Sequence, residues 1–434
     1  MQYVSRRWLE GSNGKGCLWR TLMMLLAATA VAGLVAEIVL AEESPVSAGN
    51  SLDWHQWRGP QRNGISSETA WRAKWPASGP KQLWQKVIGS GFCTVSVADG
   101  RVFTMGNDGE HDTIWCLDAN TGAEIWKHSY PCRKGEHPGP RATPTVDGKV
   151  VYTISRQSDV HCLEAATGKP VWSKNLANEL GAKVVGWGIA SSPLVVGDLL
   201  VLNVGTAGAA LDKATGEVVW QTGKGPSGYA SPVRFDMGDR RCVLVFAAKG
   251  LACVNLEDGQ RLWWLPWETQ YDVNAADPIV VGNTIFISSG YGAGCALLKV
   301  EGGKPSIVWR NRQMKNHFSS CVLYKGHLYG SDGNAGGAVV KCIDFATGDV
   351  KWTSPGLGMA SLMLAGDKLI IQGDQGKLIV AEATPSAFKP ISQATVLAGE
   401  CWTVPVLSNG RIYCRNTGRG RREGRLVCLD VKAQ

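Results

Sequence analysis

The eleven residues CLDANTGAEIW, at positions 116–126, recur along the chain with few changes. Residues 162–172 read CLEAATGKPVW, and residues 342–352 read CIDFATGDVKW. Each copy closes on a tryptophan, and successive tryptophans of this kind stand 42 to 48 residues apart. They are Trp84, Trp126, Trp172, Trp220, Trp263, Trp309 and Trp352. A period of this size predicts a stacked or radial array with one supersecondary unit per copy.

One copy shows what the unit is. Residues 143–172 read TPTVDGKVVYTISRQSDVHCLEAATGKPVW, in which short runs rich in β-branched residues alternate with glycine turns. This pattern predicts four antiparallel strands joined by tight hairpins. Because a four-stranded sheet cannot bury both of its faces alone, we expect the sheets to stack around a closed ring.

The number of copies predicts the size of the ring. Full copies begin near Thr94, Thr143, Ser192, Ser231, Asp277, Ser320 and Ser361. Residues 404–430 form an eighth set with only three strands, and the segment around Trp84 supplies a single outer strand. We therefore predict an all-β, eight-bladed β-propeller that is closed by its N- and C-terminal strands. The seven recurrent tryptophans are predicted to dock between neighbouring blades.

Composition supports this fold and narrows the function. The 434 residues include 53 glycines, and the net charge of +8 is a mild excess spread along the chain, which does not indicate nucleic-acid binding. Among the 13 cysteines, four share one register, as small core residues do: Cys116, Cys162, Cys342 and Cys428. The sequence contains no CxxC motif, so it indicates neither a cysteine metal cluster nor a c-type haem.

The first 41 residues have the pattern of an export signal. A basic stretch precedes a long apolar one, and Val39-Leu40-Ala41 before Glu42 is typical of a signal-peptidase site. The alternative is an uncleaved anchor, because the apolar stretch approaches the length needed to span a membrane. We expect export to the periplasm or cell envelope, with an entry segment packed on the propeller at residues 42–81 and the propeller at residues 82–434.

The repeated LDAxTGxxxW pattern resembles the tryptophan-docking motif of the pyrroloquinoline quinone (PQQ) propeller superfamily, over about residues 82–432. Residues 53–76 resemble the entry segment of many quinoprotein-like propellers. The resemblance implies one of two functions. The first is a non-catalytic, monomeric envelope scaffold, similar to the propeller subunit of the outer-membrane β-barrel assembly machine. It would bind an envelope protein, need no cofactor, and reach the membrane only through a partner or an uncleaved leader. The alternative is a PQQ- and Ca²⁺-dependent dehydrogenase that oxidises an alcohol or sugar.

The superfamily places its site at one end of the ring, around the central channel. Residues three or four positions before each first strand should face that end, which we call the mouth. They are Phe92, Arg141, Trp187, Tyr229, Asn274, His317, Met359 and Trp402. Aromatic side chains stack on planar groups, and an arginine can clamp a carboxylate. The residues predicted to bind a cofactor are Arg141, Trp187, Tyr229, Asn274, His317 and Trp402. The alternative is that these residues have no ligand, because aromatic and polar side chains collect at the loop ends of any propeller.

PQQ chemistry in this superfamily needs a calcium ion held by acidic and amide groups, together with an aspartate as general base. The nearest candidates are Asn274 and Asp277 as metal ligands, and Asp277 as the base. The chain lacks the adjacent Cys-Cys pair that covers the cofactor in many alcohol dehydrogenases of this type. Calcium takes at least six oxygen ligands, so we expect this site to be incomplete. The sequence therefore favours the scaffold.

Overall fold

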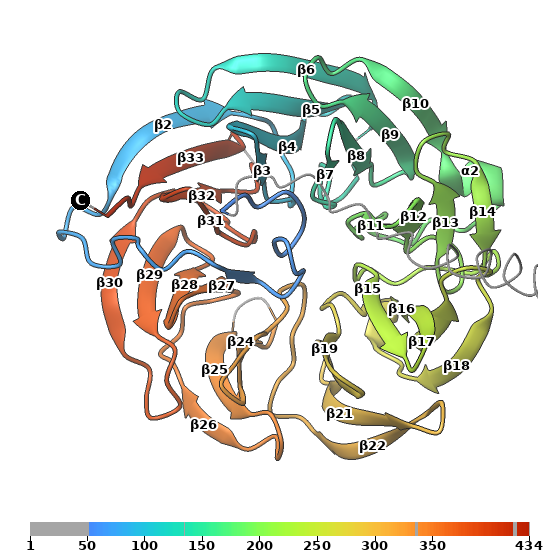
Figure 1. Cartoon of the computed structure of the whole chain (residues 1–434). Coiled ribbons are helices and arrows are strands. Elements are labelled where there is room, and N and C mark those ends of the chain that lie inside the picture. Colours follow the sequence, from blue (N-terminus) through green and yellow to red (C-terminus); the bar gives the residue numbers. More distant parts are fainter. Residues whose placement is uncertain (1–51, 134, 335–336, 420–422, 434) are drawn as a thin grey trace, which may run out of the picture. The chain divides into compact units, whose positions relative to one another are not determined.

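Short strands joined by glycine turns form eight sheets around a central channel (Figure 1). This arrangement is seen in a computed structural model that describes residues 52–133, 135–334, 337–419 and 423–433. The predicted signal peptide, residues 1–41, lies outside the described residues. In the described part, no helix is both long and apolar enough to cross a membrane.

Each blade runs from an innermost strand at the channel to an outermost strand at the rim. Blades 1 to 4 are β3 (Ser96–Ala98), β4 (Arg101–Asn107), β5 (His111–Asp118) and β6 (Glu124–Pro131); β7 (Thr145–Asp147), β8 (Val150–Ile154), β9 (Asp159–Glu164) and β10 (Pro170–Asn175); β11 (Leu194–Val196), β12 (Leu199–Leu202), β13 (Ala209–Asp212) and β14 (Val218–Gln221); β15 (Val233–Met237), β16 (Arg240–Ala247), β17 (Gly250–Asn255) and β18 (Arg261–Pro266).

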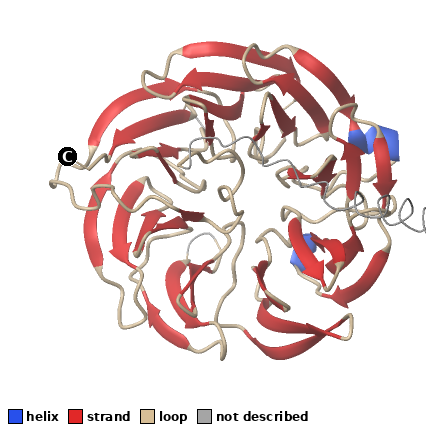
Figure 2. Ribbon diagram, viewed as in Figure 1, coloured by secondary structure: helices blue, strands red, loops and turns tan. Residues whose placement is uncertain are grey.

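Blades 5 to 8 are β19 (Ile279–Val281), β20 (Thr284–Ser289), β21 (Gly294–Glu301) and β22 (Lys304–Asn311); β23 (Val322–Tyr324), β24 (His327–Asp332), β25 (Val339–Asp344) and β26 (Val350–Thr353); β27 (Ser361–Ala365), β28 (Lys368–Gln372), β29 (Lys377–Glu382) and β30 (Pro390–Thr395); β31 (Val406–Ser408), β32 (Arg411–Arg415) and β33 (Arg425–Asp430) with β2 (Lys81–Val87). Figure 2 shows strands and loops almost throughout; α2 (Leu176–Leu180) and the 3₁₀ turn η1 (Gln270–Asp272) are short.

The ring closes as the sequence predicts. Strand β2, which carries Trp84, pairs antiparallel with β33, so one outer strand from the start of the propeller completes the last blade. The register runs from Lys81 opposite Asp430 to Val87 opposite Arg425. The prediction of eight blades closed by terminal strands is therefore confirmed.

Every outer strand has a β-bulge at one register. In blade 1, Trp126 pairs with Cys116 and Glu124 pairs with Leu117, which leaves Ile125 between them without a partner. Because a bulge adds twist and redirects the next side chain, it turns the tryptophan toward the following blade. The eight extra residues are Leu83, Ile125, Val171, Val219, Leu262, Val308, Lys351 and Ile391.

The redirected tryptophan lies over a glycine turn of the next blade. The Trp126 indole Nε1 donates to the Ala165 carbonyl at 3.0 Å. Gly168 has a φ of +73°, and a Cβ there would lie 2.5 Å from the Trp126 ring. Four further pairs share this contact: Trp84 with Gly122, Trp172 with Gly216, Trp220 with Gly259, and Trp309 with Gly348. The turn thus needs glycine both for its backbone conformation and for the space above it.

The joint between blades 4 and 5 is different. The last hairpin of blade 5 is a two-residue turn, Gly302-Gly303, in which Glu301 pairs directly with Lys304. The shortened turn offers no loop carbonyl above the indole. Within the described residues, the buried Nε1 of Trp263 has no hydrogen-bond partner. The indole at this joint therefore lacks the carbonyl acceptor that Trp126 has at its own joint.

A cysteine lies opposite five of the seven recurrent tryptophans on the neighbouring strand. Cys116 pairs across strands with Phe103 on one side and with Trp126 on the other, and the two rings lie 6.0 Å apart. In blade 5, Leu297 takes the same place between Phe286 and Trp309, whose rings lie 6.1 Å apart. All twelve cysteines in the described part are buried, and none of them forms a disulfide bond.

The entry segment loops beside the channel and then runs outward to the rim, where it leads into β2 (Figure 1, blue). Trp54 forms a bridge with Val97 of blade 1, and β1 (Ile65–Ser66) pairs parallel with β27 of blade 7. The Val146 amide of blade 2 donates to the His55 carbonyl at 2.8 Å. Residues 52–66 therefore contact blades on several sides of the ring.

We predict that Trp126→Ala lowers the free energy of unfolding by about 3–5 kcal/mol, because it removes a large, 8%-exposed aromatic from a blade joint. Urea denaturation of the purified protein measures the change. The matched control is the neighbouring bulge residue: Ile125→Ala removes a 44%-exposed side chain and should cost less than about 0.5 kcal/mol. Equal losses in both variants would show that the tryptophan has no docking role.

A pair of glycine variants tests the turn beneath the indole. Gly148 and Gly168 both have positive φ, of 56° and 73°, but a Cβ at Gly148 would have open space around it. Gly148→Ala should therefore cost only the backbone penalty, about 1–2 kcal/mol. We expect Gly168→Ala to cost about 1–3 kcal/mol more than Gly148→Ala, because its methyl group would meet the Trp126 ring. Equal costs in thermal unfolding would contradict this account of the joint.

Candidate functional site

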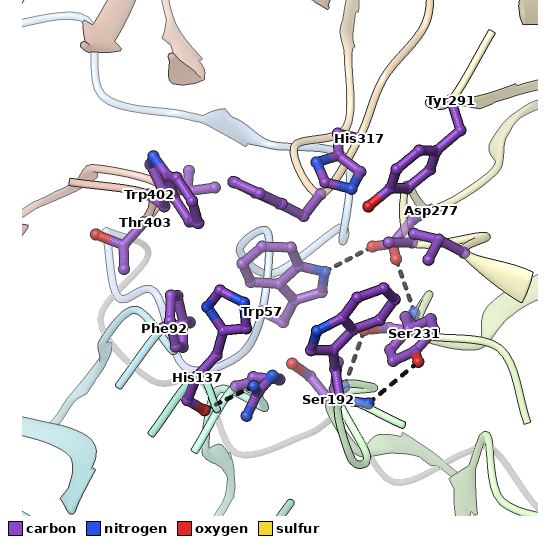
Figure 3. A pocket seen from close by; sticks show the side chains of 18 of the residues that line it. Trp57, Phe92, His137, Ser192, Ser231, Asp277, Tyr291, His317, Trp402 and Thr403 are labelled. Carbon is purple, nitrogen blue, oxygen red and sulfur yellow. Dashed lines mark hydrogen bonds between the residues drawn. The ribbon is translucent and has the colours of Figure 1, made fainter. Parts of the chain in front are cut away.

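A cavity of about 400 Å³ lies at the predicted mouth of the ring (Figure 3). Its walls come mainly from the loops that precede the first strands of the blades, because these loops converge on the channel. Of the residues predicted to face the mouth, the following line the cavity: Phe92, Arg141, Trp187, Tyr229, His317 and Trp402. Asp277 also lines it, whereas Asn274 and Met359 are buried outside the lining.

Aromatic rings surround most of the cavity. Trp402 lies 5.0 Å from Phe318, and Tyr291 contacts His317 edge-on at 4.9 Å between ring centroids. On the opposite wall, Trp187 packs 6.1 Å from Tyr229. The cavity is therefore suited to a flat apolar group, because such a group can stack on these rings.

Sequence reasoning missed several members of this lining, among them four that carry rings: Trp57, His137, Tyr291 and Phe318. Phe318 directly follows the predicted His317, and Tyr291 lies in the loop between β20 and β21. In an antiparallel blade, the loop after the second strand is at the same end as the loop before the first strand. That geometric rule would have found Tyr291, whereas no local pattern marks Trp57.

Arg141 is a fixed cation in the wall. Its Nη1 donates to the Gly139 carbonyl and its Nη2 to the His137 carbonyl, both at 2.8 Å. The guanidinium carbon is 5.1 Å from the centre of the Phe92 ring. Burial, followed by repulsion from Arg156, lowers the pKa of Arg141 to about 10, so the side chain stays charged at neutral pH.

His317 is neutral at the same pH. Burial lowers the pKa of its imidazole to about 4. Its Nδ1 is buried and has no hydrogen-bond partner among the described residues. The ring thus acts as a flat, uncharged part of the wall.

Asp277 is buried at the cavity floor, where the entry segment occupies its carboxylate (Figure 3). The Trp57 indole donates to Oδ2 at 2.6 Å, and the Ser231 amide donates to Oδ1 at 2.8 Å. Arg58 Nε lies 3.9 Å from Oδ2, and both side chains are 4% exposed. Burial raises the pKa of Asp277, while the charges of Arg58 and Arg62 oppose that rise.

Asn274 holds the backbone beneath the cavity. Its Nδ2 is within hydrogen-bond distance of the carbonyls of Ala247 (2.9 Å), Ala248 (3.2 Å) and Trp267 (3.1 Å). Its Oδ1 accepts from the Ser289 hydroxyl at 2.7 Å. The side chain is fully buried, and its hydrogen-bonding groups are already in use.

Asn274 and Asp277, the predicted calcium ligands, do not fit a calcium site as the structure places them. Calcium takes six to eight oxygen ligands. Here the Asp277 oxygens accept hydrogen bonds from N–H groups and lie beside the Arg58 guanidinium. The Asn274 oxygen accepts a hydrogen bond from a hydroxyl group. The residues that the structure describes contain no group of three or more His, Cys, Asp or Glu side chains able to hold a metal ion.

Comparison with known proteins gives one family match. The family model described as "Outer membrane protein assembly factor BamB" (PQQ_2) matches residues 110–354, which is more than half of the chain. The protein of this name from Burkholderia pseudomallei is 26% identical over 249 residues, covering 54% of this chain and 59% of that protein. The one from Xanthomonas campestris is 27% identical over 135 residues, covering 30% of each. The chain thus spans less than two thirds of the length of these relatives.

Solved structures share the fold at low identity. BamB from Moraxella catarrhalis is 16% identical, with a TM-score of 0.61, and the match covers 81% of this chain and all of that one. A quinohemoprotein alcohol dehydrogenase from Comamonas testosteroni is 13% identical, with a TM-score of 0.66, and covers 88% of this chain and 81% of that one. At these identities the likeness shows the propeller fold alone.

The neutral state of His317 predicts a dependence of stability on pH. In the unfolded chain its imidazole takes up a proton near pH 6.5, whereas in the folded state it does so only near pH 4. Its contribution is therefore present above pH 6.5 and is lost as the pH falls toward 4. Between pH 7.5 and pH 5, wild type should lose about 1–2 kcal/mol more than His317→Phe does in urea denaturation. Identical losses would contradict a buried neutral imidazole.

Proposed function

The chain belongs to the PQQ-like propeller family described as outer membrane protein assembly factor BamB, and on this premise we propose that it is a non-catalytic envelope scaffold. In this role it binds a protein partner during assembly of the outer membrane, as the names of its relatives suggest. The proposal that the protein is not an enzyme rests on the interactions of the Asp277 carboxylate. Its carboxylate, which a dehydrogenase would need as a base, is held by Trp57, Ser231 and Arg58.

The same proposal places the protein in the cell envelope. Residues 1–41 have the pattern of an export signal, and the relatives carry the name of an outer-membrane assembly factor. We propose a monomer that is exported to the periplasm and that associates with the membrane through its partner or through an uncleaved leader. It needs no cofactor for this role.

A PQQ-dependent dehydrogenase is the second candidate. The aromatic cavity and the Arg141 guanidinium favour it, because they suit a planar anionic group. The hydrogen bonds that the side chains of Asn274 and Asp277 make within the protein argue against a dehydrogenase. Without a calcium site, the quinone would lack the cation that polarises it.

Deletion of the gene in its own host tests the scaffold proposal. We expect the amount of integral outer-membrane proteins in purified outer membranes to fall, and expression of the wild-type protein to restore it. The double variant Arg58→Gln/Asp277→Asn should also restore it, because it removes the buried carboxylate together with the guanidinium closest to it. Quantitative mass spectrometry gives the readout, and circular dichroism verifies that the double variant folds. Unchanged protein levels in the deletion strain, or a folded double variant that fails to restore them, would overturn the proposal.

The enzyme alternative has its own test on purified protein. We expect that Ca²⁺ adds no thermal stabilisation beyond that of PQQ alone, and that ethanol and glucose support no dye reduction. Calcium-dependent binding at a hundredfold excess over Kd would stabilise the protein by about 2.7 kcal/mol, which a melting curve detects easily. Such a shift together with dye reduction would establish a dehydrogenase instead.

A further inference from the structure

Two neighbouring hairpins, one from blade 4 and one from blade 5, enclose a cleft at the end of the ring opposite the mouth. The cleft has a volume of about 430 Å³. We propose that it binds an extended segment of a partner protein in which an apolar side chain stands close to an acidic one. The inference rests on the proposed function for its biological setting, because it gives the scaffold a docking site for a partner.

The hairpin of β15 and β16 in blade 4 is longer than its counterpart in blade 5. The first strand of blade 5 ends at Val281, four residues after Asp277. In blade 4, Ser231 occupies the place of Asp277, yet β15 continues to Met237, six residues on. The hydrogen bonds fix this equivalence, because the Ser192 amide donates to Ser231 as the Ser231 amide donates to Asp277.

The last hairpin of blade 5, formed by β21 and β22, is also extended. Eight residues separate Leu298 from its partner Ile307, whereas six separate Leu163 from Pro170 at the same register of blade 2. In an antiparallel blade, the turn after the first strand and the turn after the third strand lie at the same end. Both extensions therefore point away from the mouth, and they stand beside each other across the joint between blades 4 and 5.

Apolar side chains form the floor of the cleft. Phe235 of blade 4 and Val300 of blade 5 are 2% and 5% exposed and belong to one core cluster, against which the half-buried Met237 packs. Met237 reaches across the joint, since a Cβ at Gly303 would lie 4.0 Å from its sulfur. A methionine side chain is flexible and polarizable, so it adapts to an apolar group placed against it. The floor thus suits one apolar side chain of a partner.

Glycines leave the rim of the cleft without side chains. Gly238 and Gly302 have φ of 63° and 56°, and a Cβ at either position would have no atom within 4 Å. The positive φ alone favours glycine in these turns. The bare turns also allow another backbone to come close, as glycines in sheets do elsewhere. An extended chain can therefore lie across the rim while one of its side chains reaches the floor.

The charges around the cleft favour an acidic group on that chain. Arg240 lines the cleft, and Lys304 begins β22 directly after the blade 5 turn. Neither forms an ion pair with any described residue, whereas Asp236, the one carboxylate among the described lining residues, pairs with Arg234 at 3.4 Å. Asp239, in the turn before Arg240, does not line the cleft. A carboxylate of the partner would therefore meet unpaired cations.

Photocrosslinking in living host cells tests the proposal on the full-length chain. The photoreactive residue p-benzoylphenylalanine replaces Asn283, an exposed residue of the cleft, and in a matched control it replaces Lys149, at the same place in the blade 2 turn. We expect at least ten times more protein adduct from position 283 than from position 149. Mass spectrometry of the digested adduct should place the crosslink in one protein, on a segment with an apolar residue within two positions of an aspartate or glutamate.

Substitutions on the blade 4 hairpin complete the test. With the crosslinker at position 283, Arg240→Glu should lower the yield of adduct at least fivefold, because it reverses the charge that lines the cleft. Arg241→Glu, on the same hairpin but outside the cleft, is the matched control and should change the yield less than twofold. Met237→Asp is a second variant that should also lower the yield at least fivefold. Circular dichroism verifies that each variant folds.

Several outcomes would overturn the docking proposal. They are equal yields at the two crosslinker positions, no adduct, an adduct with a second copy of this chain or with lipid, a crosslinked segment without an acidic residue, and a yield that Arg240→Glu and Met237→Asp leave unchanged. If one of these occurs while deletion of the gene still lowers outer-membrane protein levels, the scaffold proposal stands and only the cleft is excluded. Unchanged outer-membrane protein levels, together with a specific adduct, would instead exclude the scaffold proposal and retain the docking site.

Discussion

The contact between an indole and a glycine turn sets the geometry of the whole ring. A bulge before Trp126 turns its side chain toward blade 2, where Gly168 leaves room for the ring and Ala165 accepts the indole proton. The contact recurs at five of the eight joints, where it sets the angle between one blade and the next. The joint at Trp263 lacks the acceptor because the facing turn has only two residues.

The mouth is a consequence of that geometry. Once the blades are fixed, the loops before their first strands converge, and side chains far apart in sequence, such as Arg141 and Trp402, form one cavity. The entry segment then determines what this cavity can do chemically. It places the Trp57 indole and the Arg58 guanidinium against the Asp277 carboxylate. In a metal-dependent enzyme, that carboxylate would instead have to be free to bind the metal ion.

The sequence was sufficient to predict the number of blades, their closure and much of the mouth, because each rests on a periodic pattern. A fixed offset before each first strand located Arg141 and His317 correctly. The same offset placed Asn274 at the mouth, but its amide turns inward to three carbonyls that no local pattern reveals. Trp57 escaped prediction because it belongs to no repeat, and its contact with Asp277 joins residues 220 positions apart.

The closure of blade 8 also has a consequence for the order of folding. Strand β2 is among the first parts of the propeller to be synthesised, yet its partner β33 is among the last. Throughout synthesis, β2 therefore has an unpaired edge, and long-range pairings of this kind form slowly. Blades in the middle of the chain can assemble with their neighbours as they emerge, whereas the ring remains open until the final strand is available. Without residues 425–430, β2 would have no partner strand and the ring would stay open.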